Sequence, residues 1–414
     1  MNALVAWLAI AVAALTAPAA GPAASAGWPQ WGGPQRNFVV DAPPLATSWP
    51  DGGPRRLWRR PLGDGFSSIV TDGATIYTLY RDGADDVAIA LDAETGRTKW
   101  ESRYAAPFVE TCSQRLGPAP RAAPLIAGER LIAVSAGGLM HSFNRQTGAV
   151  QWTRDLVAGT PAAVRACGYS SSPLAYKDRI ITTAGGKGRG VIAVDAATGA
   201  TVWQAQDFDN GYSSPILIDL DGRPELVVFT YGEIAGLDPD TGRLEWQQAH
   251  PAEFGVNVAT PIWGDDHLLF VSSAYNGGSR VLKLARTGAT VSVSEVWASQ
   301  RVRIHFGNAV RLGTRIYASN GDFGAAPLAA IDVATGEMRW RDRSVARATL
   351  IGTGSMLVLL DEDGTLAIAT PGESGLVVHA KAPILDGRSW TAPTLSGTRL
   401  FVRNQREILA LDLR

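Results

Sequence analysis

The side chains best suited to chemistry recur at equivalent positions of the chain, two or three residues ahead of a series of apolar hairpins. Aromatic rings together with arginines suit a flat anionic ligand or a peptide loop inserted by a partner. The alternative is that about half of these side chains point between neighbouring units and only pack. The aligned positions are Phe66, Arg121, Ser170, Tyr212, Val258, Phe306, Arg347 and Trp390. We expect six of them to contact a ligand or partner: Phe66, Arg121, Tyr212, Phe306, Arg347 and Trp390. We expect the same of His305, which precedes Phe306.

Other candidate sites carry weaker signals. Asp219-Leu220-Asp221-Gly222 with Glu225 offers fewer oxygens than calcium requires, and Asp-Gly between apolar strands is a turn signal. The glycine-rich run Gly185–Gly190 joins two expected strands, so it predicts a hairpin tip and not a phosphate loop. Gly-x-Ser-x-Gly is absent. The histidines have no zinc-ligand spacing: His141, His250, His267, His305 and His379. We therefore predict no metal site and no catalytic residue.

A repeated stretch must position these side chains. It reads ALDAETGRTKW at Ala90–Trp100, and one decayed copy ends at Trp297. An apolar run predicts a strand covered on both faces, the Asp starts a turn, and the Gly supplies the positive φ that the turn requires. The Trp on the returning strand can fill the wedge between neighbouring sheets. The other clear copies end at Trp152, Trp203, Trp246 and Trp340.

An apolar hairpin with a polar or glycine tip precedes each repeat, which sets the number of units. The hairpins begin at Ser68, Pro124, Pro173, Pro215, Pro261, Ala309, Leu350 and Pro393. Each unit of about 45 residues supplies four antiparallel strands, the length and content of a propeller blade. The sequence thus predicts an all-β, eight-bladed β-propeller. Its predicted docking rings are Trp58, Trp100, Trp152, Trp203, Trp246, Trp297 and Trp340.

The two ends of the chain predict how the ring closes. The last unit stops at Ile408–Arg414, without an outer Trp strand, whereas Trp58 lies just before the first hairpin. We expect the strand around Trp58 to complete the last blade and to remove the exposed sheet edge. The seventh unit is degenerate, with His379 near the place where a Trp is expected.

Residues 1–26 lack charge and end in Ala24-Ser25-Ala26, which predicts a secretory signal peptide. No basic residue precedes the apolar run, so an uncleaved anchor is the alternative. Residues 27–414 are expected to form a single propeller domain without an integral membrane span, periplasmic or secreted, and monomeric. The formal net charge of -1 argues against a nucleic-acid partner.

The Asp-x-x-Thr-Gly-x-x-x-Trp repeat, the eight units and the opening Trp28–Pro34 resemble the PQQ-like β-propeller repeat proteins of bacteria. One branch of that family comprises quinoprotein alcohol dehydrogenases, which bind pyrroloquinoline quinone and calcium at the propeller centre. Another is the noncatalytic scaffold of the outer-membrane β-barrel assembly machinery. The dehydrogenases carry a disulfide between adjacent cysteines, but this chain has only Cys112 and Cys167, which are 55 positions apart.

These cysteines lie in the two longest connections, Trp100 to Pro124 and Trp152 to Pro173. In an oxidising compartment we expect them to form a disulfide that ties neighbouring loops. The resemblance and its departures favour an exported, noncatalytic scaffold with a protein partner in the cell envelope and no cofactor. The alternative is a quinone-dependent alcohol or sugar oxidoreductase that binds pyrroloquinoline quinone and calcium.

Overall fold

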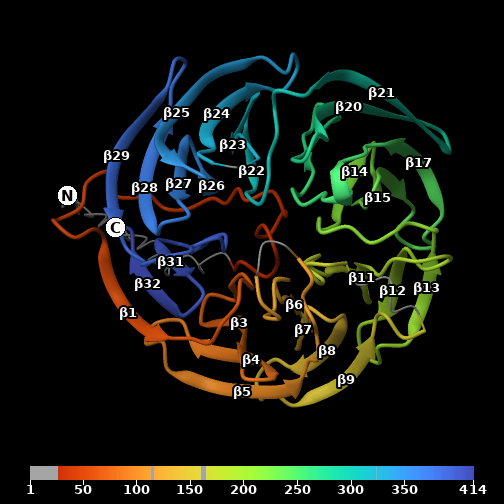
Figure 1. The fold of residues 1–414 in the computed structure, drawn as a ribbon, viewed down its shortest axis with the longest axis horizontal. Coiled ribbons are helices and arrows are strands. Elements are labelled where there is room, and N and C mark those ends of the chain that lie inside the picture. Colours follow the sequence, from red (N-terminus) through yellow and green to blue (C-terminus); the bar gives the residue numbers. More distant parts are fainter. Residues whose placement is uncertain (1–26, 113–115, 160–164, 323) are drawn as a thin grey trace, which may run out of the picture.

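The computed structural model describes residues 27–112, 116–159, 165–322 and 324–414. Within them, eight four-stranded antiparallel sheets stand around a common centre, as the repeat predicted (Figure 1). Each sheet is one blade, and consecutive blades follow the chain around the ring. The only helix described is the short 3-10 turn η2 (Glu253–Gly255). No helix in these ranges is long and apolar enough to cross a membrane.

The strands of the first four blades run from the inner to the outer edge of each sheet. They are β2 (Val70–Thr71), β3 (Thr75–Asp82), β4 (Asp85–Asp92) and β5 (Thr98–Ala105); β6 (Leu125–Ala127), β7 (Arg130–Val134), β8 (Leu139–Asn144) and β9 (Val150–Asp155); β10 (Leu174–Tyr176), β11 (Arg179–Thr183), β12 (Val191–Asp195) and β13 (Thr201–Ala205); β14 (Ile216–Leu220), β15 (Arg223–Phe229), β16 (Glu233–Leu237) and β17 (Leu244–Ala249).

The other four blades follow the same order, except that the last takes its outer strand from the start of the chain. They are β18 (Ile262–Trp263), β19 (Leu268–Ser273), β20 (Gly278–Thr287) and β21 (Thr290–Ser299); β22 (Ala309–Leu312), β23 (Arg315–Ser319), β24 (Pro327–Asp332) and β25 (Met338–Ala346); β26 (Thr349–Thr353), β27 (Met356–Leu360), β28 (Thr365–Pro371) and β29 (Leu376–Pro383); β30 (Thr394–Ser396), β31 (Arg399–Arg403), β32 (Glu407–Asp412) and β1 (Arg55–Pro61).

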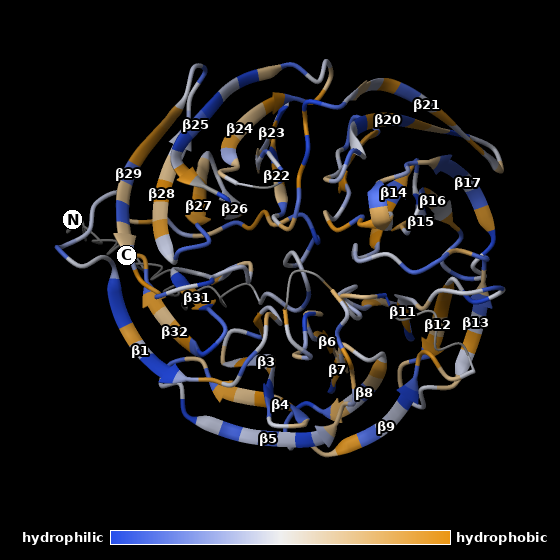
Figure 2. Ribbon diagram, viewed as in Figure 1, coloured by the Kyte–Doolittle hydropathy of each residue, from blue (hydrophilic) through white to orange (hydrophobic). Residues whose placement is uncertain are grey.

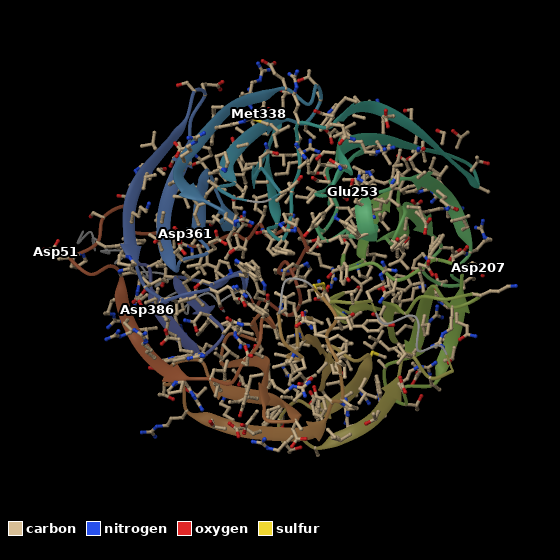
Figure 3. The ribbon with its side chains drawn as sticks, in the orientation of Figure 1. Asp51, Asp207, Glu253, Met338, Asp361 and Asp386 are labelled. Carbon is tan, nitrogen blue, oxygen red and sulfur yellow. A yellow bond between two sulfur atoms is a disulfide. The ribbon has the colours of Figure 1, made fainter. Side chains whose placement is uncertain are left out.

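The core lies between neighbouring blades, where the middle strands are covered on both faces. In the first blade the six residues between the ends of β4 are all buried, whereas β5 has exposed and covered residues in turn. Figure 2 shows the difference: β4 is largely hydrophobic, and β5 carries more hydrophilic residues. Side chains crowd the space between the sheets, and Asp51 and Asp207 lie at the outer edge (Figure 3).

The turn of each clear repeat forms as its sequence predicts. Asp92 Oδ1 accepts hydrogen bonds from the Glu94 and Thr95 amides at 3.2 and 2.9 Å, and Gly96 has a φ of 68°. A short acceptor side chain therefore holds the turn that the glycine makes sterically accessible. The same bond to the amide two residues on is made by Asn144, Asp195, Asp238 and Asp332.

The repeat tryptophans join one blade to the next. Trp100 in β5 lies against Gly148 in the following blade and donates from Nε1 to the Arg145 carbonyl oxygen at 2.9 Å. A Cβ on Gly148 would lie 2.5 Å from the Trp100 ring, so this glycine is needed for space as well as for its φ of 74°. Equivalent bonds to the next blade come from Trp58, Trp152, Trp203, Trp297 and Trp340.

Trp246 in β17 departs from this pattern because the following repeat is the decayed one. That blade replaces the Asp-Thr-Gly turn with the long β20–β21 hairpin. The Trp246 indole instead donates to the carboxylate of Glu225 in its own blade. Glu225 is fully buried and also binds Arg286 of the next blade at 2.7 Å. A buried ion pair thus takes the place of the missing turn.

A β-bulge on every outer strand explains why the side chain at the tryptophan position faces the neighbouring blade. In all eight blades the register between the third and fourth strands shifts beside the tryptophan position. An extra residue there re-aims the next side chain. In the seventh blade the bulged residue is His379, and Ala380 pairs with Ile368 where the other blades place Trp. His379 therefore lies beside the tryptophan position, as expected, and Ala380 occupies it.

The ring closes through β1, as the chain ends predicted. β1 pairs with β32, and Trp58 lies opposite Ala410. Arg403 of β31 strengthens the same seam from inside. Its guanidinium is fully buried and donates to the Leu79 carbonyl oxygen in the first blade at 2.7 Å. Burial lowers the pKa of Arg403 to about 9.

Candidate functional site

The aligned side chains that precede the hairpins meet around one cavity of about 140 Å³ at the mouth of the central channel. Arg347 lines an adjoining cavity with His305, and Phe306 and Trp390 border both. The structure thus brings the predicted set together around the channel. The aligned residues on the main cavity are Phe66, Arg121, Ser170, Tyr212, Val258, Phe306 and Trp390.

Aromatic rings form one side of this cavity. Phe66 and Trp390 are stacked with ring centroids 5.9 Å apart, and Phe306 lies 5.1 Å from Trp390. The row continues outwards through His305, whose ring stacks on Phe306 at 3.6 Å. Because these residues lie just before the inner strands of the first, sixth and eighth blades, ring closure is needed to bring them together.

Trp31 also lines the cavity, although the sequence reasoning did not select it as a site residue. Its indole Nε1 donates to Thr260 Oγ1 at 2.8 Å. The available signal was a pair of tryptophans, Trp28 and Trp31, in a stretch outside the repeats.

The segment that carries Trp31 runs across the centre of the ring (Figure 1). Trp28 forms a β-bridge with Thr71 of the first blade, and Val39 bridges Gly352 of the seventh. Between them, the buried Arg36 donates to the Ser172 and Pro173 carbonyl oxygens at 3.1 and 3.0 Å. Blades on different sides of the channel therefore hold Trp31 in place.

Small polar residues form a second row, two positions after the aligned set. Ser172 Oγ accepts from the Ala123 amide, and Ser214 Oγ accepts from the Ser172 amide, both at 2.9 Å. Asn308 makes two hydrogen bonds to the Leu350 backbone, at 2.8 and 2.9 Å. These bonds join the inner strands of neighbouring blades, which share no β-ladder. The polar groups of Ser172, Ser214 and Asn308 are therefore engaged by the protein itself.

Arg121 is the only charged side chain on the main cavity among the described residues. Its side chain is only 6% exposed, and it pairs with Glu110 at 3.3 Å. It also donates to the Gly117 carbonyl oxygen at 2.6 Å. Burial lowers the pKa of Arg121, and the Glu110 carboxylate opposes that effect. The charge that was expected to attract an anionic ligand is thus neutralised within the protein.

Arg347 is also paired. Its Nε lies 3.0 Å from Glu362 Oε1, and the other oxygen of Glu362 accepts from Trp390 Nε1 at 3.1 Å. A further cation, Arg388, lies 4.4 Å above the Trp390 ring, but it is exposed and does not line the cavity. Glu362 therefore fixes the aromatic wall and removes the second expected anion-binding charge.

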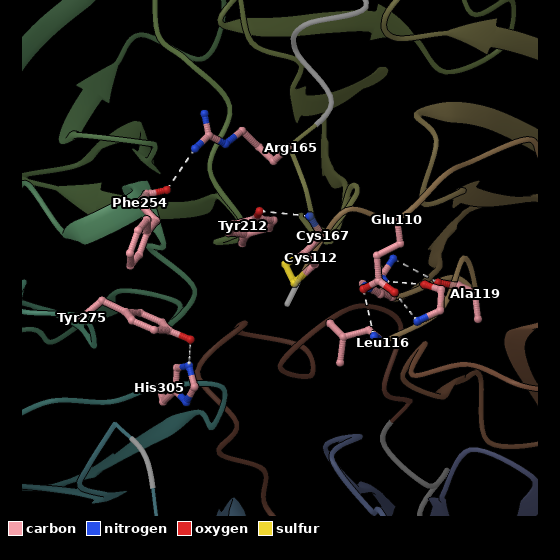
Figure 4. The surroundings of a disulfide bond; sticks show 12 residues. Glu110, Cys112, Leu116, Ala119, Arg165, Cys167, Tyr212, Phe254, Tyr275 and His305 are labelled. Carbon is pink, nitrogen blue, oxygen red and sulfur yellow. Dashed lines mark hydrogen bonds and ion pairs between the residues drawn. A yellow bond between two sulfur atoms is a disulfide. The ribbon is translucent and has the colours of Figure 1, made fainter. Parts of the chain in front are cut away.

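The two long connections meet in a disulfide between Cys112 and Cys167, whose Cα atoms are 4.8 Å apart (Figure 4). Cys167 lines the cavity, and its amide donates to the Tyr212 hydroxyl at 3.3 Å. Glu110 accepts from the Leu116 amide at 2.9 Å. The disulfide and this carboxylate together shape the rim of the cavity.

Arg81 of β3 holds the base of the first cysteine loop. Its guanidinium donates to the carbonyl oxygens of Ala106 and Pro118 at 2.9 and 2.8 Å. Its Nε lies 2.8 Å from the fully buried Asp86 carboxylate. Burial raises the pKa of Asp86 to about 7, although the Arg81 charge acts in the opposite direction.

The other candidate groups do not converge. Asp219 caps its own turn by accepting from the Gly222 amide at 2.8 Å, and Glu225 binds Arg286 and Trp246. Gly185–Gly190 connects β11 to β12 as a hairpin tip. Across the ranges that the structure describes, no three acidic, His or Cys side chains are grouped as metal ligands.

The chain matches one protein family in two overlapping segments. Residues 49–187 and 165–300 match the family described as outer membrane protein assembly factor BamB. No curated protein sequence matches the chain.

Solved structures share the fold at low sequence identity. BamB from Moraxella catarrhalis is 18% identical, with a TM-score of 0.58 over 86% of this chain and 97% of its own. Quinohemoprotein alcohol dehydrogenase from Comamonas testosteroni is 14% identical, with a TM-score of 0.65 over 94% of this chain and 81% of its own. The computationally designed Ika8 protein is 12% identical, with a TM-score of 0.54 over 89% of this chain and all of its own. An enzyme, an assembly factor and a designed protein share this architecture, so the fold alone does not define an activity.

Proposed function

Because the chain belongs to the BamB family of outer membrane protein assembly factors, we propose that it is an exported, noncatalytic binding scaffold of the cell envelope. The proposal places a protein partner over the face that carries the cysteine loops. It assigns the aromatic cavity to recognition and not to chemistry.

The observation that carries this proposal is the internal pairing of both arginines near the channel mouth. Arg121 is neutralised by Glu110, and Arg347 by Glu362. Catalytic cavities generally expose groups that can exchange protons, attack a substrate or stabilise a developing charge. Here the two arginines and their carboxylate partners hold the loops and the aromatic wall in place, which suits a rigid recognition surface.

Two exposed apolar side chains, of the kind that partners bury, lie on or against the cysteine loops. Val109 is 83% exposed, and Phe254 is 71% exposed in η2 with a φ of 60°. A large aromatic residue in this strained conformation is typical of functional positions. Phe254 is held there by Arg165, which donates to its carbonyl oxygen at 2.9 Å (Figure 4).

The quinone alternative fits these residues poorly. A cavity of about 140 Å³ encloses about one six-membered ring, so pyrroloquinoline quinone, with three fused rings, would protrude from it. Its carboxylates would need free cations, and calcium would need six to eight oxygen ligands including carboxylates. The described residues that line the cavity include no carboxylate.

Export rests on two features of the chain. Residues 1–26 have the composition of a signal peptide but lie outside the described residues. The Cys112–Cys167 disulfide is a bond that persists in oxidising compartments such as the periplasm. Sequencing the N-terminus of the protein purified from its host tests export: a start near Gly27 supports it.

A photoreactive amino acid introduced at Val109 or Phe254 in the native host tests the scaffold role. We expect both positions to crosslink to the same envelope protein. The matched control is Val377, which is 55% exposed on β29 of the outer ring, and it should give no such product. Equal crosslinking at all three positions would contradict the proposed surface. Alcohol oxidation after addition of quinone and calcium would contradict the noncatalytic role.

A further inference from the structure

The cavity at the channel mouth has the size and chemistry of a site for a single uncharged ring. Resting on the proposed recognition function, we propose that it binds one neutral monocyclic aromatic group between the Phe66–Trp390–Phe306 wall and Trp31. Such a group is either a free small molecule or the side chain of a Tyr or Phe residue of the partner. The ring chemistry is the same in both cases.

The volume of the cavity suits one aromatic ring. The cavity of about 140 Å³ is close to the volume of about 150 Å³ at which an apolar protein cavity accepts benzene. A fused ring system would either extend out of the cavity or need the walls to move apart. That movement is opposed by Trp31, which is bonded to Thr260, and by Trp390, which is bonded to Glu362.

Aromatic geometry gives the second argument. Trp390 stacks on Phe66 at an interplanar angle of 26° and lies beside Phe306 at 38°. Neither contact closes the cavity, because all three rings still line it. An added ring can make offset or edge contacts with this wall, and such contacts are worth about 0.5–1.5 kcal/mol beyond the area they bury.

Charge gives the third argument. Arg121, the charged lining residue, is held by Glu110 and by the Gly117 carbonyl oxygen. Ser172, Ser214 and Asn308 use their polar atoms to join neighbouring blades. A carboxylate on the ligand would lose its water without gaining a free cation, which is strongly unfavourable. The exposed Arg388 lies over the Trp390 ring but is not among the residues that line the cavity.

Calorimetry of the full chain with p-cresol and with p-hydroxybenzoate tests this preference, because the two probes share a ring and differ in charge. We expect p-cresol to bind at least tenfold more tightly than p-hydroxybenzoate. Val258→Trp, which places a large ring in the cavity, should reduce p-cresol binding at least tenfold. Val202→Trp, on the outer strand β13, is the matched control and should bind as the wild type does. Equal or tighter binding of p-hydroxybenzoate, or unchanged p-cresol binding by Val258→Trp, would overturn the proposal.

If Val258→Trp does not fold, Phe306→Ala tests the same point by removing part of the aromatic wall, and it should weaken p-cresol binding. Unchanged binding by a folded Phe306→Ala would also overturn the proposal.

Crosslinking from position 109 in the Val258→Trp variant distinguishes the two sources of the ring, the partner and a small molecule. Loss of the partner crosslink assigns the ring to the partner. A retained crosslink, together with a monocyclic aromatic compound released from the purified wild-type protein, assigns it to a small molecule. Partner crosslinking without p-cresol binding would leave the scaffold function standing and overturn only the ring site. Failure of the scaffold function would show as absent crosslinks while p-cresol still binds.

Discussion

The indole Nε1 of Trp58 donates a hydrogen bond to the carbonyl oxygen of Ala93 at 3.2 Å. Trp58 belongs to the last blade and Ala93 to the first, so this bond crosses the interface between the last and first blades, the seam of the ring. The same relationship joins Trp100 to Arg145 between the first two blades. The seam is therefore an ordinary blade interface, because the chain runs on from β1 into β2, and the ring itself is closed inside the last blade by the pairing of β1 with β32.

Removing the Trp58 ring should open this seam. We expect Trp58→Ala to lower the free energy of unfolding by about 2–4 kcal/mol, and Trp100→Ala, which removes a more deeply buried ring, by about 3–5 kcal/mol. Urea unfolding followed by circular dichroism measures both. A chain that begins at Pro61 lacks the strand around Trp58 and should be less stable than either variant. Stability equal to that of the full chain would exclude closure by β1.

Gly148 combines a positive φ with contact to a tryptophan, and Gly128 provides a control with the first feature alone. Gly128 has a φ of 59° and nothing within 4 Å of an added Cβ, whereas an added Cβ on Gly148 would clash with Trp100. We expect Gly128→Ala to cost about 1 kcal/mol and Gly148→Ala at least twice as much, since only the latter displaces the ring. Equal shifts in the urea midpoint would argue that Trp100 does not depend on this contact.

The disulfide should stabilise the loops over the cavity. Replacing Cys112 and Cys167 with Ala removes a crosslink that spans 55 residues, and we expect a loss of about 2–4 kcal/mol. Thermal unfolding of this variant and of the reduced wild type measures the effect. The two should agree, because each lacks the same bond. Faster proteolysis within 106–118, with the blades intact, would localise the change to the loop.

Buried histidines should make the protein less stable in mild acid. Burial, followed by the charge of Arg280, lowers the pKa of His250 to about 4, and burial lowers that of His141 to about 4 as well. The unfolded chain, with a histidine pKa near 6.5, binds more protons over this interval. Stability is therefore complete above pH 6.5 and falls as the pH drops towards 4, by on the order of 1–2 kcal/mol per histidine at pH 5.

The variant His250→Phe isolates one of these contributions. It should lose less stability than the wild type between pH 7 and pH 5. The control His379→Phe changes an exposed histidine of the outer strand and should keep the loss of stability that His250 causes. An unchanged slope for His250→Phe would show that His250 does not charge on unfolding.

Local sequence predicted the architecture well because the residues of each repeat determine the geometry of that repeat. Asp92 and Gly96 specify a turn through a side-chain acceptor and a positive φ, and both act within a few residues. The position of Trp58 before the first hairpin likewise predicted its place in the last blade, since a sheet edge must be covered. These inferences needed no knowledge of distant contacts.

The candidate site was predictable only in outline. The alignment of Phe66, Phe306 and Trp390 indicated a common ring, and the structure places all three on one cavity. Of the two expected occupants, a flat anionic ligand or an inserted peptide loop, the first depended on Arg121 and Arg347 being free. Their partners, Glu110 and Glu362, occupy no special position in the repeat, so the neutral character of the cavity could not be read from spacing.

The sequence by itself determined the eight blades, their turns and the strand that closes the ring, because these follow from repeated short-range chemistry. The tertiary structure alone decided that Trp31 lines the cavity, that both arginines are neutralised and that Ala380 takes the vacant tryptophan position. Each of these depends on segments far apart in the chain, or on a one-residue bulge, that meet only when the ring is closed.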